Sequence, residues 1–385
     1  MSADAATVRL NGPMPGVRAW RKHIARVEGR PAGGELVRVV DAWDVFVGWG
    51  WWHPRSQIAV RLVTRAEVPP DLDAWRARAV AAARLRLDDP EIPDDVCRLF
   101  HAEGDDFPAL VVDRYGPVLA AEAYTAEAAR LFEELVPALH ETLGTEHFRL
   151  TFDADAARAE DEQAFEKRSA GCPPRLQFEE NGVTFEVFLD EGHKTGFFCD
   201  QRENRARLRS LVEGKSVLDV CSYTGGFALN AAAAGAAEVR GIDLDEKAVE
   251  QAKRNANLNR MRDVKFTHAD AFSYLRQLQR NGQTFDVVVL DPPKFIPSRR
   301  AFDEGKAKYN DLNKLAIPLV AEGGSFITCS CSGLFSPIDF QETIRRAARL
   351  RPLRILRETG AGPDHPVRID FPEGRYLKAF WMRAD

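Results

Sequence analysis

The chain has 385 residues, of which 45% are hydrophobic and 29% are charged, and its formal net charge is −5. This length exceeds one ordinary hydrophobic core, so we expect a globular protein of two or three domains. A negative net charge gives no support for nucleic-acid binding. No apolar run is long enough to span a membrane, and the N-terminus lacks a signal-peptide pattern. The six cysteines show neither a disulfide framework nor zinc-ligand spacing, so we expect a cytoplasmic protein with reduced thiols and no bound metal.

The first half of the chain indicates two small domains. Residues 34–65 alternate valine-rich segments with glycine breaks, which predicts the strands of a small β-barrel, and Pro69 and Pro70 mark its boundary. The residues that follow indicate a mixed α/β domain. It has a helix, two strands, a second helix and a charged loop, predicted over 74–88, 109–116, 118–124, 126–143 and 154–172.

The second half indicates a Rossmann-like α/β domain. Asn181-Gly182 lies between alternating apolar runs and predicts a hairpin over 176–190. After Asp200, helices and strands alternate as in a parallel sheet. Strands are predicted at 217–220, 239–242, 264–267, 286–290, 325–328 and 376–382. We therefore predict an α/β protein with three domains over residues 1–70, 71–190 and 191–385.

Residues 216–245 are the most informative segment of the chain. They indicate a buried strand, a glycine turn, an alanine-rich helix and a second strand that ends at Asp243. Such a β–α–β unit places its ligand at the carboxyl ends of its strands. Gly225 and Gly226 let backbone N–H groups approach a ligand, and Asp243 can accept both hydroxyl groups of a ribose. The turn has neither a dinucleotide fingerprint nor a P-loop. We therefore interpret it as a site for S-adenosylmethionine (SAM); a tight turn without a ligand is the alternative.

Acidic residues also follow the third and fourth predicted strands. Asp270 can accept from an adenine amine or cap the helix over 272–279, and the two roles are compatible. Asp291 opens the run Asp291-Pro292-Pro293-Lys294-Phe295, which resembles the D/N-P-P loop of methyltransferases that act on nucleobases. Its carboxylate can hydrogen-bond a base edge or stabilise a protonated ring nitrogen. A surface turn after a core strand is the structural alternative.

The fifth predicted strand brings Cys329 and Cys331 to the same edge. Carbon 5 of cytosine becomes nucleophilic when a thiolate adds to carbon 6, so an enzyme that methylates carbon 5 needs an accessible cysteine beside the methyl donor. Cys329 lies inside the apolar run and is expected in the core, whereas Cys331 lies at the strand end and is the better nucleophile. Both cysteines could equally be small buried hydrophobes.

Several long motifs together resemble a known family. They are CSYTGGFAL (221–229), DPPKF (291–295), SCSGL (330–334), EGHKTGFF (191–198) and the tail that begins at Asp364-His365-Pro366. They are similar to the RlmI-type large-subunit (23S) ribosomal RNA cytosine-5 methyltransferases. The resemblance implies an N-terminal PUA domain that binds RNA, a small middle domain and a C-terminal SAM-binding methyltransferase domain. It also implies 23S ribosomal RNA as the partner, and a homodimer is a further possibility.

The resemblance assigns roles to individual residues. Cys331 takes the role of the nucleophile and Asp291 that of the base-contacting acid, while Pro292, Pro293, Lys294 and Phe295 form the substrate loop. Gln201 and Arg202 would lie near the methionine part of SAM. The remaining residues expected around the cofactor are Asp219, Tyr223, Thr224, Gly225, Gly226, Asp243, Asp270 and Ala271.

The chain departs from this family at its N-terminal segment, in its tryptophans and in the stretch 153–168, which lacks the basic character seen in relatives. The tryptophans at 43, 49, 51 and 52 either form the barrel core or stack on RNA bases, and we expect Arg55, Arg61 and Arg65 to be exposed RNA contacts. Two other functions stay open. A methyltransferase acting on a base nitrogen would use the same D-P-P loop without the cysteine, and an assembly factor could bind RNA with an idle SAM fold.

Overall fold

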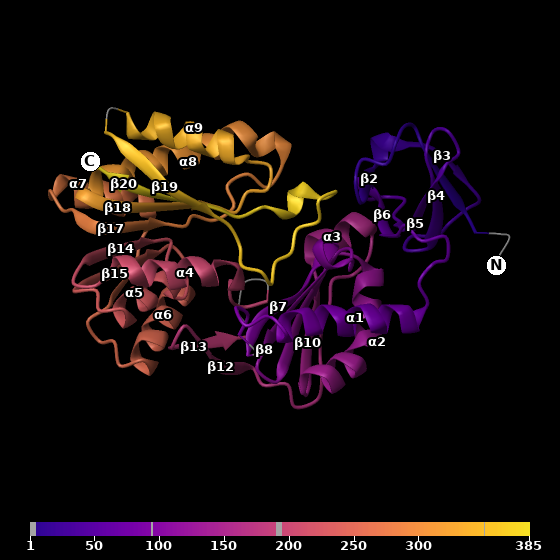
Figure 1. Ribbon diagram of the computed structural model, residues 1–385, viewed down its shortest axis with the longest axis horizontal. Coiled ribbons are helices and arrows are strands. Elements are labelled where there is room, and N and C mark those ends of the chain that lie inside the picture. Colours follow the sequence, from indigo (N-terminus) through magenta and orange to yellow (C-terminus); the bar gives the residue numbers. More distant parts are fainter. Residues whose placement is uncertain (1–4, 94, 190–194, 350) are drawn as a thin grey trace. The chain divides into compact units, whose positions relative to one another are not determined.

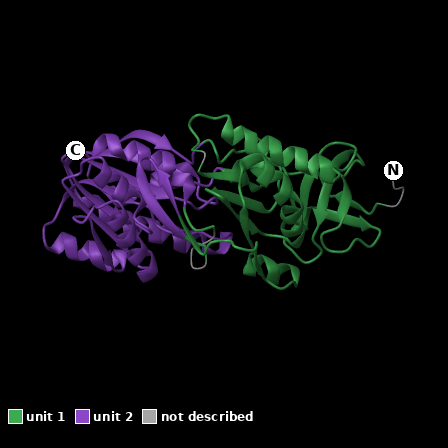
Figure 2. Ribbon diagram, turned by 90° about the horizontal axis from the view of Figure 1, so that it is seen from below, with its two compact units in different colours: residues 1–176, 188–197, 363–374 green, residues 177–187, 198–362, 375–385 purple. Residues whose placement is uncertain are grey.

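The computed structural model describes residues 5–93, 95–189, 195–349 and 351–385 (Figure 1). The chain divides into two compact units, which Figure 2 shows in different colours. Unit 1 comprises residues 1–176, 188–197 and 363–374, and unit 2 comprises residues 177–187, 198–362 and 375–385. The segment 363–374 thus returns from the C-terminal part of the chain to unit 1, and the linear pattern of the sequence did not indicate that return.

The N-terminal part of unit 1 is a six-stranded sheet in the order β2-β6-β5-β4-β1-β3. Three of its strands lie within 34–65, as predicted, but three further strands precede them. The strands are β1 (Thr7–Leu10), β2 (Arg18–Trp20), β3 (Ile24–Glu28), β4 (Leu36–Val40), β5 (Phe46–Trp52) and β6 (Ile58–Thr64). Gly48 is required in β5 because its φ is +150° and a Cβ there would lie 2.2 Å from the carbonyl oxygen of Thr64.

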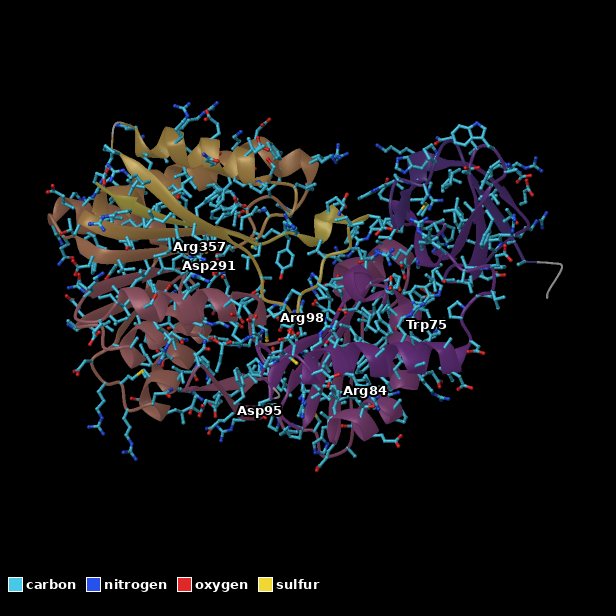
Figure 3. The ribbon with its side chains drawn as sticks, viewed as in Figure 1. Trp75, Arg84, Asp95, Arg98, Asp291 and Arg357 are labelled. Carbon is cyan, nitrogen blue, oxygen red and sulfur yellow. The ribbon has the colours of Figure 1, made fainter. Side chains whose placement is uncertain are left out.

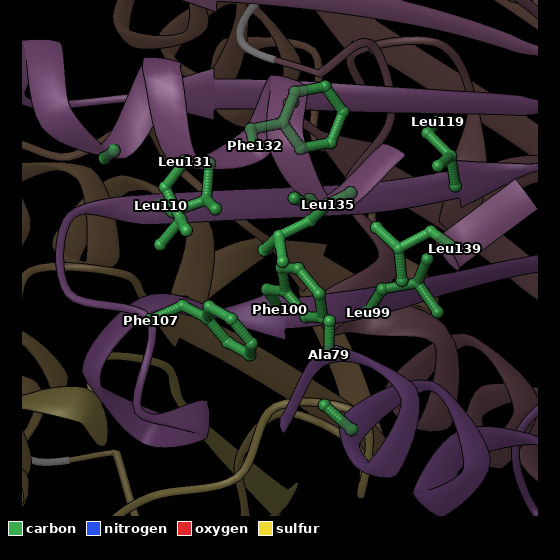
Figure 4. Close-up of a cluster of buried hydrophobic side chains, with 14 of the residues drawn as sticks. Ala79, Leu99, Phe100, Phe107, Leu110, Leu119, Leu131, Phe132, Leu135 and Leu139 are labelled. Atoms are coloured by element: carbon green, nitrogen blue, oxygen red, sulfur yellow. The ribbon is translucent and has the colours of Figure 1, made fainter. Parts of the chain in front are cut away.

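The second sheet of unit 1 carries the larger apolar core. Its order is β11-β10-β9-β8-β7. Buried leucines and phenylalanines from its strands and from α2, together with Trp75 and alanines from α1, fill the interior (Figure 4). The helix α2 was predicted to the residue, because Thr125 caps it by accepting from the Ala128 amide at 3.2 Å and Gly144 ends it with a φ of +65°. The elements are α1 (Leu72–Leu87), β7 (Val96–His101), β8 (Leu110–Tyr115), β9 (Val118–Ala123), α2 (Ala126–Leu143) and β10 (His147–Phe152).

The prediction of a loop over 154–172 was wrong. The segment forms the helix α3 (Ala154–Glu160) and the strand β11 (Glu166–Arg168), which pairs with β10. Asp153 caps the helix by accepting from the Ala156 amide at 2.8 Å, and Ala157 packs in a small apolar cluster. The helix forms because Asp153 caps it, and the strand forms because β10 pairs with it. The charged side chains of this segment show no periodicity that would have predicted either element.

The returning segment 363–374 is held to unit 1 by buried charges. One oxygen of Asp364 accepts from the Arg98 amide at 2.9 Å, and the Asp364 carbonyl accepts from Arg86 at 2.8 Å. Arg86 also pairs with Asp105 at 2.6 Å. The partly exposed Arg368 pairs with Asp106. Such contacts between distant parts of the sequence leave no local signal.

The hairpin predicted at Asn181-Gly182 is present as β12 (Arg175–Glu180) and β13 (Val183–Phe188). Both turn residues have the positive φ that this turn needs, +54° and +74°. Its predicted last residue, Asp190, lies outside the described residues, as do residues 191–194 of the family motif.

Unit 2 is built on a seven-stranded sheet in the order β16-β15-β14-β17-β18-β20-β19. The five strands from β16 to β18 are parallel, and β20 runs antiparallel to both of its neighbours. All six predicted strands are confirmed, while β19 was not predicted. The strands are β14 (Ser216–Val220), β15 (Glu238–Asp243), β16 (Lys265–His268), β17 (Phe285–Leu290), β18 (Val320–Ser330), β19 (Leu353–Thr359) and β20 (Lys378–Ala384).

Helices cover both faces of this sheet (Figure 1). The apolar side chains of α7, α8 and α9 join the sheet in one cluster around Tyr309, Phe335 and Phe340. The helices of unit 2 are α4 (Arg202–Leu208), α5 (Gly226–Ala233), α6 (Glu246–Leu258), α7 (Ala271–Arg280), α8 (Phe302–Ala316) and α9 (Pro337–Ala348). No helix in the described ranges is long and apolar enough to cross a membrane. All six cysteines are described, and none of them forms a disulfide.

Candidate active site

The predicted site residues of unit 2 gather at one edge of the sheet. Strands β14, β15, β16, β17 and β18 are parallel, so their carboxyl ends share that edge. Asp243 ends β15, Asp270 follows β16, Asp291 follows β17 and Cys331 follows β18. Figure 3 labels Asp291. This is the edge at which an open parallel sheet binds its ligand.

The turn between β14 and α5 is tight and conformationally unusual. Cys221, Tyr223 and Gly225 all have positive φ, at +63°, +48° and +88°. Packing within the protein requires a glycine at both positions. A Cβ on Gly225 would lie 2.8 Å from the Phe266 ring, and one on Gly226 would lie 2.9 Å from the Arg205 side chain. Non-glycine residues with positive φ are uncommon and gather at functional sites.

Asp219 lies fully buried beneath this turn. One carboxylate oxygen accepts from the Ala228 amide of α5 at 2.9 Å, and the other oxygen has no hydrogen-bond partner among the described residues. Burial, helped by the negative charges of Asp291 and Asp243, raises the pKa of Asp219 to about 8. A buried oxygen without a partner is costly, so it indicates that a ligand or water completes the site.

Asp243 and Asp270 both have structural partners in addition to any ligand. The Asp243 carboxylate accepts from the amides of Tyr223 and Asp245 at 2.8 and 2.9 Å. Asp270 is exposed and accepts from the Ser273 amide at 2.9 Å, so the predicted N-cap of α7 is confirmed. Each carboxylate oxygen can accept more than one hydrogen bond, so both side chains can still receive a ribose or an adenine amine.

The carboxylates of this edge fit a cationic ligand. The charges of Asp219, Asp243, Asp291 and Asp270 all act on the half-buried Cys221 thiol and raise its pKa beyond the effect of desolvation. SAM carries a positive sulfonium and an ammonium group, which would relieve the repulsion among these acids. The unpartnered oxygen of Asp219 and the strained turn supply the remaining polar groups, so the residues fit this cofactor.

Of the other residues expected around the cofactor, Thr224 is buried within the turn and Ala271 begins α7. Arg202 is buried at the start of α4, and its Nε contacts the Glu203 carboxylate at 3.3 Å. Its neighbour Gln201 points to Asp291, with Nε2 donating to Oδ2 at 3.0 Å. The predicted contacts of this pair with the methionine part of SAM therefore stay predictions.

Asp291 lies next to β14 as well as at the end of β17, because its amide donates to the Val220 carbonyl at 3.1 Å. Burial raises the pKa of its carboxyl group to about 7, the charge of Asp200 adds to that rise, and the hydrogen bond from Gln201 opposes it. Of the loop that follows, Pro292 is buried and Pro293 and Lys294 are exposed. A carboxyl group with a pKa near neutrality can exchange a proton under ordinary conditions.

The two cysteines of β18 have different surroundings. Cys329 is fully buried, as expected for a core residue, and burial raises the pKa of its thiol well above the usual value. Cys331 lies just beyond the end of the strand and is half-buried. A buried thiol of high pKa is a poor nucleophile, so the burial difference favours Cys331.

Ser332 ties the cysteine loop to the Asp291 loop. Its hydroxyl accepts from the Ile296 amide at 3.2 Å and hydrogen-bonds the Tyr309 hydroxyl at 3.0 Å. Phe295 packs edge-on against the Tyr309 ring, with centroids 5.0 Å apart. The loops that carry Asp291 and Cys331 are thus joined through shared partners.

Lys378 is a site residue to which the sequence analysis gave no role. It is buried on β20, opposite Ser330, and its Nζ donates to the Ser332 carbonyl at 2.7 Å. Burial lowers the pKa of Lys378 to about 8, and a charged Cys331 counteracts that fall. A lysine inside an otherwise apolar strand, KAFWM, was the available signal, because lysine is almost never fully buried without a partner.

In the N-terminal module of unit 1, which is the part of the predicted domain 1–70 that carries β1 to β6, some aromatic and basic residues lie in the core and others on the surface. Trp51 and Trp52 are buried, whereas Trp43 is 70% exposed. The prediction that Arg61 is exposed was wrong: it is buried and pairs with Glu103 at 3.2 Å. The hydrophobic strand leaves the guanidinium no solvent, so a buried carboxylate compensates its charge.

Arg55 and Arg65 are exposed, as expected, but each already contacts an acid. Arg55 pairs with Asp161, and Arg65 lies 3.3 Å from Asp370. Exposed pairs of this kind contribute little and exchange readily, so both cations remain available to a phosphate. The tryptophan at 49 is half-buried and donates to the Glu67 carbonyl at 3.0 Å.

Family comparisons agree with this geometry. Residues 154–379 match the S-adenosylmethionine-dependent methyltransferase family, and residues 19–65 match the PUA-like domain family. The chain is 36% identical over 371 residues to a protein of Shewanella amazonensis named ribosomal RNA large subunit methyltransferase I, covering 94% of this chain and 93% of that protein. It is also 36% identical to the Vibrio cholerae protein of the same name, with the same coverage.

Solved structures show the same fold. A Streptococcus mutans protein described as a candidate SAM-dependent methyltransferase has a TM-score of 0.83 at 20% identity, covering 98% of this chain and 100% of that chain. The candidate methyltransferase SMU.776, solved with S-adenosylhomocysteine (SAH), has a TM-score of 0.81 at 21% identity and covers 92% of both chains.

Proposed function

Because the chain belongs to the family of S-adenosylmethionine-dependent methyltransferases that includes the ribosomal RNA large subunit methyltransferase I proteins, we propose that it methylates large-subunit ribosomal RNA. It uses SAM as its cofactor, and it carries a PUA-like domain before the methyltransferase domain. We propose further that its target atom is carbon 5 of a cytosine and that Cys331 is the nucleophile.

The observation that carries the cytosine proposal is the placement of Cys331 and Asp291 on joined loops at the ends of neighbouring strands. Ser332, directly after Cys331, contacts both the Ile296 amide and the Tyr309 hydroxyl. A base held between the two loops would meet a thiol and a carboxyl group together. Addition of the thiolate to carbon 6 makes carbon 5 nucleophilic, and Asp291 can hydrogen-bond the ring nitrogen or amine at the opposite edge.

The residues of this chain divide the remaining tasks. Lys378 places a buried ammonium beside Cys331, and a nearby positive charge favours the thiolate. After methyl transfer a base must remove the proton from carbon 5 so that the thiol can leave. Bound SAM supplies an electrophilic methyl group, and Asp219, Asp243 and the turn from Tyr223 to Gly226 would hold it at the carboxyl edge.

RNA would reach this site with the help of the N-terminal module. The module presents Trp43 on its surface, and its exposed cations include Arg55 and Arg65. Aromatic rings stack on unpaired bases, and arginines contact phosphates. We propose that residues 1–70 contribute RNA affinity and little to the chemical step.

A trapping experiment tests the nucleophile. Ribosomal RNA that carries 5-fluorocytosine should form a covalent complex with the wild-type protein, because fluorine cannot leave carbon 5 as a proton does. Cys331→Ala should abolish both turnover and the trap while it preserves SAM binding. Cys329→Ala is the matched control: it should mainly cost packing and still form the trap.

The other outcomes separate the alternatives. A trap that forms with Cys331→Ala and fails with Cys329→Ala would exchange the roles of the two cysteines. Methylation without a trap in either variant would favour transfer to a base nitrogen, for which the Asp291 loop is also suited. SAM binding with no methylation of any ribosomal RNA would favour an assembly factor.

A further inference from the structure

A chain of side-chain hydrogen bonds leads from the outer strands of the unit 2 sheet to Asp291. The Trp381 indole N–H donates to Thr359 Oγ1 at 2.7 Å, and the Thr359 hydroxyl donates to Asn204 Oδ1 at 2.6 Å. Asn204 Nδ2 donates to Gln201 Oε1 at 2.6 Å, and Gln201 Nε2 donates to Asp291 Oδ2 at 3.0 Å. Each side chain in this series therefore donates to the next one, in the direction from Trp381 to Asp291.

The first donor, the Trp381 indole, sets the direction of all the hydrogen bonds that follow. An indole N–H can only donate, so Thr359 must accept from Trp381 and is left to donate onward. Asn204 therefore presents its carbonyl oxygen to Thr359 and its amine to Gln201. The carbonyl oxygen of Gly360, 3.3 Å from Asn204 Nδ2, independently requires the same orientation, because two acceptors would otherwise face each other.

Burial makes this direction matter. Trp381, Asn204 and Gln201 are each less than 5% exposed, so water competes little for their polar groups. If the Gln201 amide turned over, its oxygen would face the Asp291 carboxylate, and its amine would face the Asn204 amine, which would then have no acceptor. In a poorly solvated network that mismatch costs more than in water, so the remote donor decides how Gln201 points.

We propose that Trp381 and Thr359 are positioning residues, which act through Asn204 and Gln201 to keep an N–H donor on Asp291. The inference rests on the proposed function, in which Asp291 contacts the target base. A fixed donor on Oδ2 orients the carboxyl group and leaves Oδ1 toward the base. Trp381 lies on β20 and Thr359 on β19, the last two strands at one edge of the sheet. These strands thereby take part in the site without touching substrate or cofactor.

Loss of the donor should be visible as a change in the titration of Asp291. The hydrogen bond from Gln201 lowers the pKa of a carboxyl group that burial and Asp200 raise, so losing it should move the pKa upward. The other charged or titratable groups that interact with Asp291 among the described residues include Arg205 on α4, Asp219 on β14, Cys221 after β14 and Cys329 on β18. None of them is altered by a substitution at Thr359.

The experiment compares Thr359→Val with Thr359→Ser. Valine matches the shape of threonine but has no hydroxyl, so it breaks the chain, whereas serine keeps the hydroxyl and should rescue it. Thr343→Val is the control: among the described residues, the hydroxyl of this buried threonine bonds only the Asp339 carbonyl of its own helix, at 2.8 Å. Single-turnover methylation of ribosomal RNA would be measured over the pH range in which Asp291 titrates.

Thr359→Val should slow methyl transfer roughly three- to tenfold, the change expected for one hydrogen bond, with SAM affinity nearly unchanged. The limb of its pH profile that reports Asp291 should move to higher pH. Trp381→Phe should move it in the same direction, because Thr359 then loses the donor that orients it. Thr359→Ser and Thr343→Val should keep the wild-type profile.

A wild-type rate and profile for Thr359→Val would overturn the proposal, as would an equal loss in Thr343→Val. A second readout does not depend on the reaction: the Asp291 carboxyl carbon, labelled with ¹³C and identified by its absence in Asp291→Asn, can be titrated by NMR. An upward shift of that titration in Thr359→Val, in a protein that fails to methylate cytosine, would support the chain of hydrogen bonds and refute the proposed function.

Discussion

The interior of the second sheet of unit 1 and the carboxyl edge of the unit 2 sheet use burial in opposite ways. In unit 1, Phe100 and Phe107 stack with ring centroids 4.0 Å apart, within a cluster of buried apolar side chains. At the edge of unit 2, burial instead raises the pKa of Asp219 to about 8 and that of Asp291 to about 7. The first region is stable as it stands, whereas the second is poised for a ligand that supplies positive charge.

The two regions also differ in backbone conformation, which is regular around the core of unit 1 and unusual at the edge of the unit 2 sheet. Regular, capped elements such as α2 enclose the core of unit 1, while the turn after β14 includes two non-glycine residues with positive φ, Cys221 and Tyr223. Strain of this kind persists only where the surrounding structure enforces it. The comparison teaches that stability and function are concentrated in different parts of this chain.

The largest expected effect comes from opening the core of unit 1. Phe132 is fully buried, so Phe132→Ala should lower the free energy of unfolding by about 3–5 kcal/mol, the usual cost of removing a buried phenyl ring. Six of the seven tryptophans lie in unit 1, at 20, 43, 49, 51, 52 and 75, so urea unfolding followed by tryptophan fluorescence reports mainly this unit. Trp43→Ala, at an exposed position, should leave stability unchanged; an equal loss there would contradict the assignment of the core.

The second effect is a dependence of unit 2 stability on pH in the absence of SAM. The folded pKa of Asp219, about 8, lies above its ordinary value of 3.8, so folding is favoured while the group is protonated. This contribution is complete below the ordinary value and is lost as the pH rises toward 8, by on the order of a few kcal/mol. Hydrogen exchange of the β14 amides should show the loss, and Asp219→Asn should flatten it.

Asp286 provides the control for that measurement. The amide and hydroxyl of Ser216 donate to its carboxylate at 2.8 Å and lower its pKa. Its contribution therefore has the opposite sign, present above the ordinary pKa and lost as the pH falls. Asp286→Asn should leave the loss of stability toward high pH intact, and a flat profile in this variant would mean that Asp219 is not its source.

The third and smallest effect concerns Asp243 and the cofactor. Asp243→Ala should weaken SAM binding by roughly 1.5–3 kcal/mol, the range for a hydrogen bond to a charged group. Isothermal titration calorimetry measures the affinity, and thermal unfolding checks that the turn survives the loss of the contacts to Tyr223 and Asp245. Unchanged affinity in a folded variant would remove Asp243 from the ribose site.

Local patterns in the sequence predicted much of this fold. Helix α2 was found from its cap residues and apolar spacing, and the hairpin from Asn181-Gly182, because both signals act between neighbours in the chain. The order of acidic residues after the strands also predicted the carboxyl edge of unit 2, since parallel strands must end together. The helix and strand within 154–172 were missed, because a cap and a partner strand outweighed a charged composition.

What the sequence by itself determined is the set of chemical groups: Cys331, Asp291, the glycine turn and the acids after each strand. Only the tertiary structure decided which of them are buried, and therefore that Cys329 is in the core and that Arg61 is paired. The returning segment 363–374 and the contacts of Lys378 have the same origin. Burial and pairing depend on residues far apart in the chain, and a desolvated charge is stable only beside a partner that local sequence cannot name.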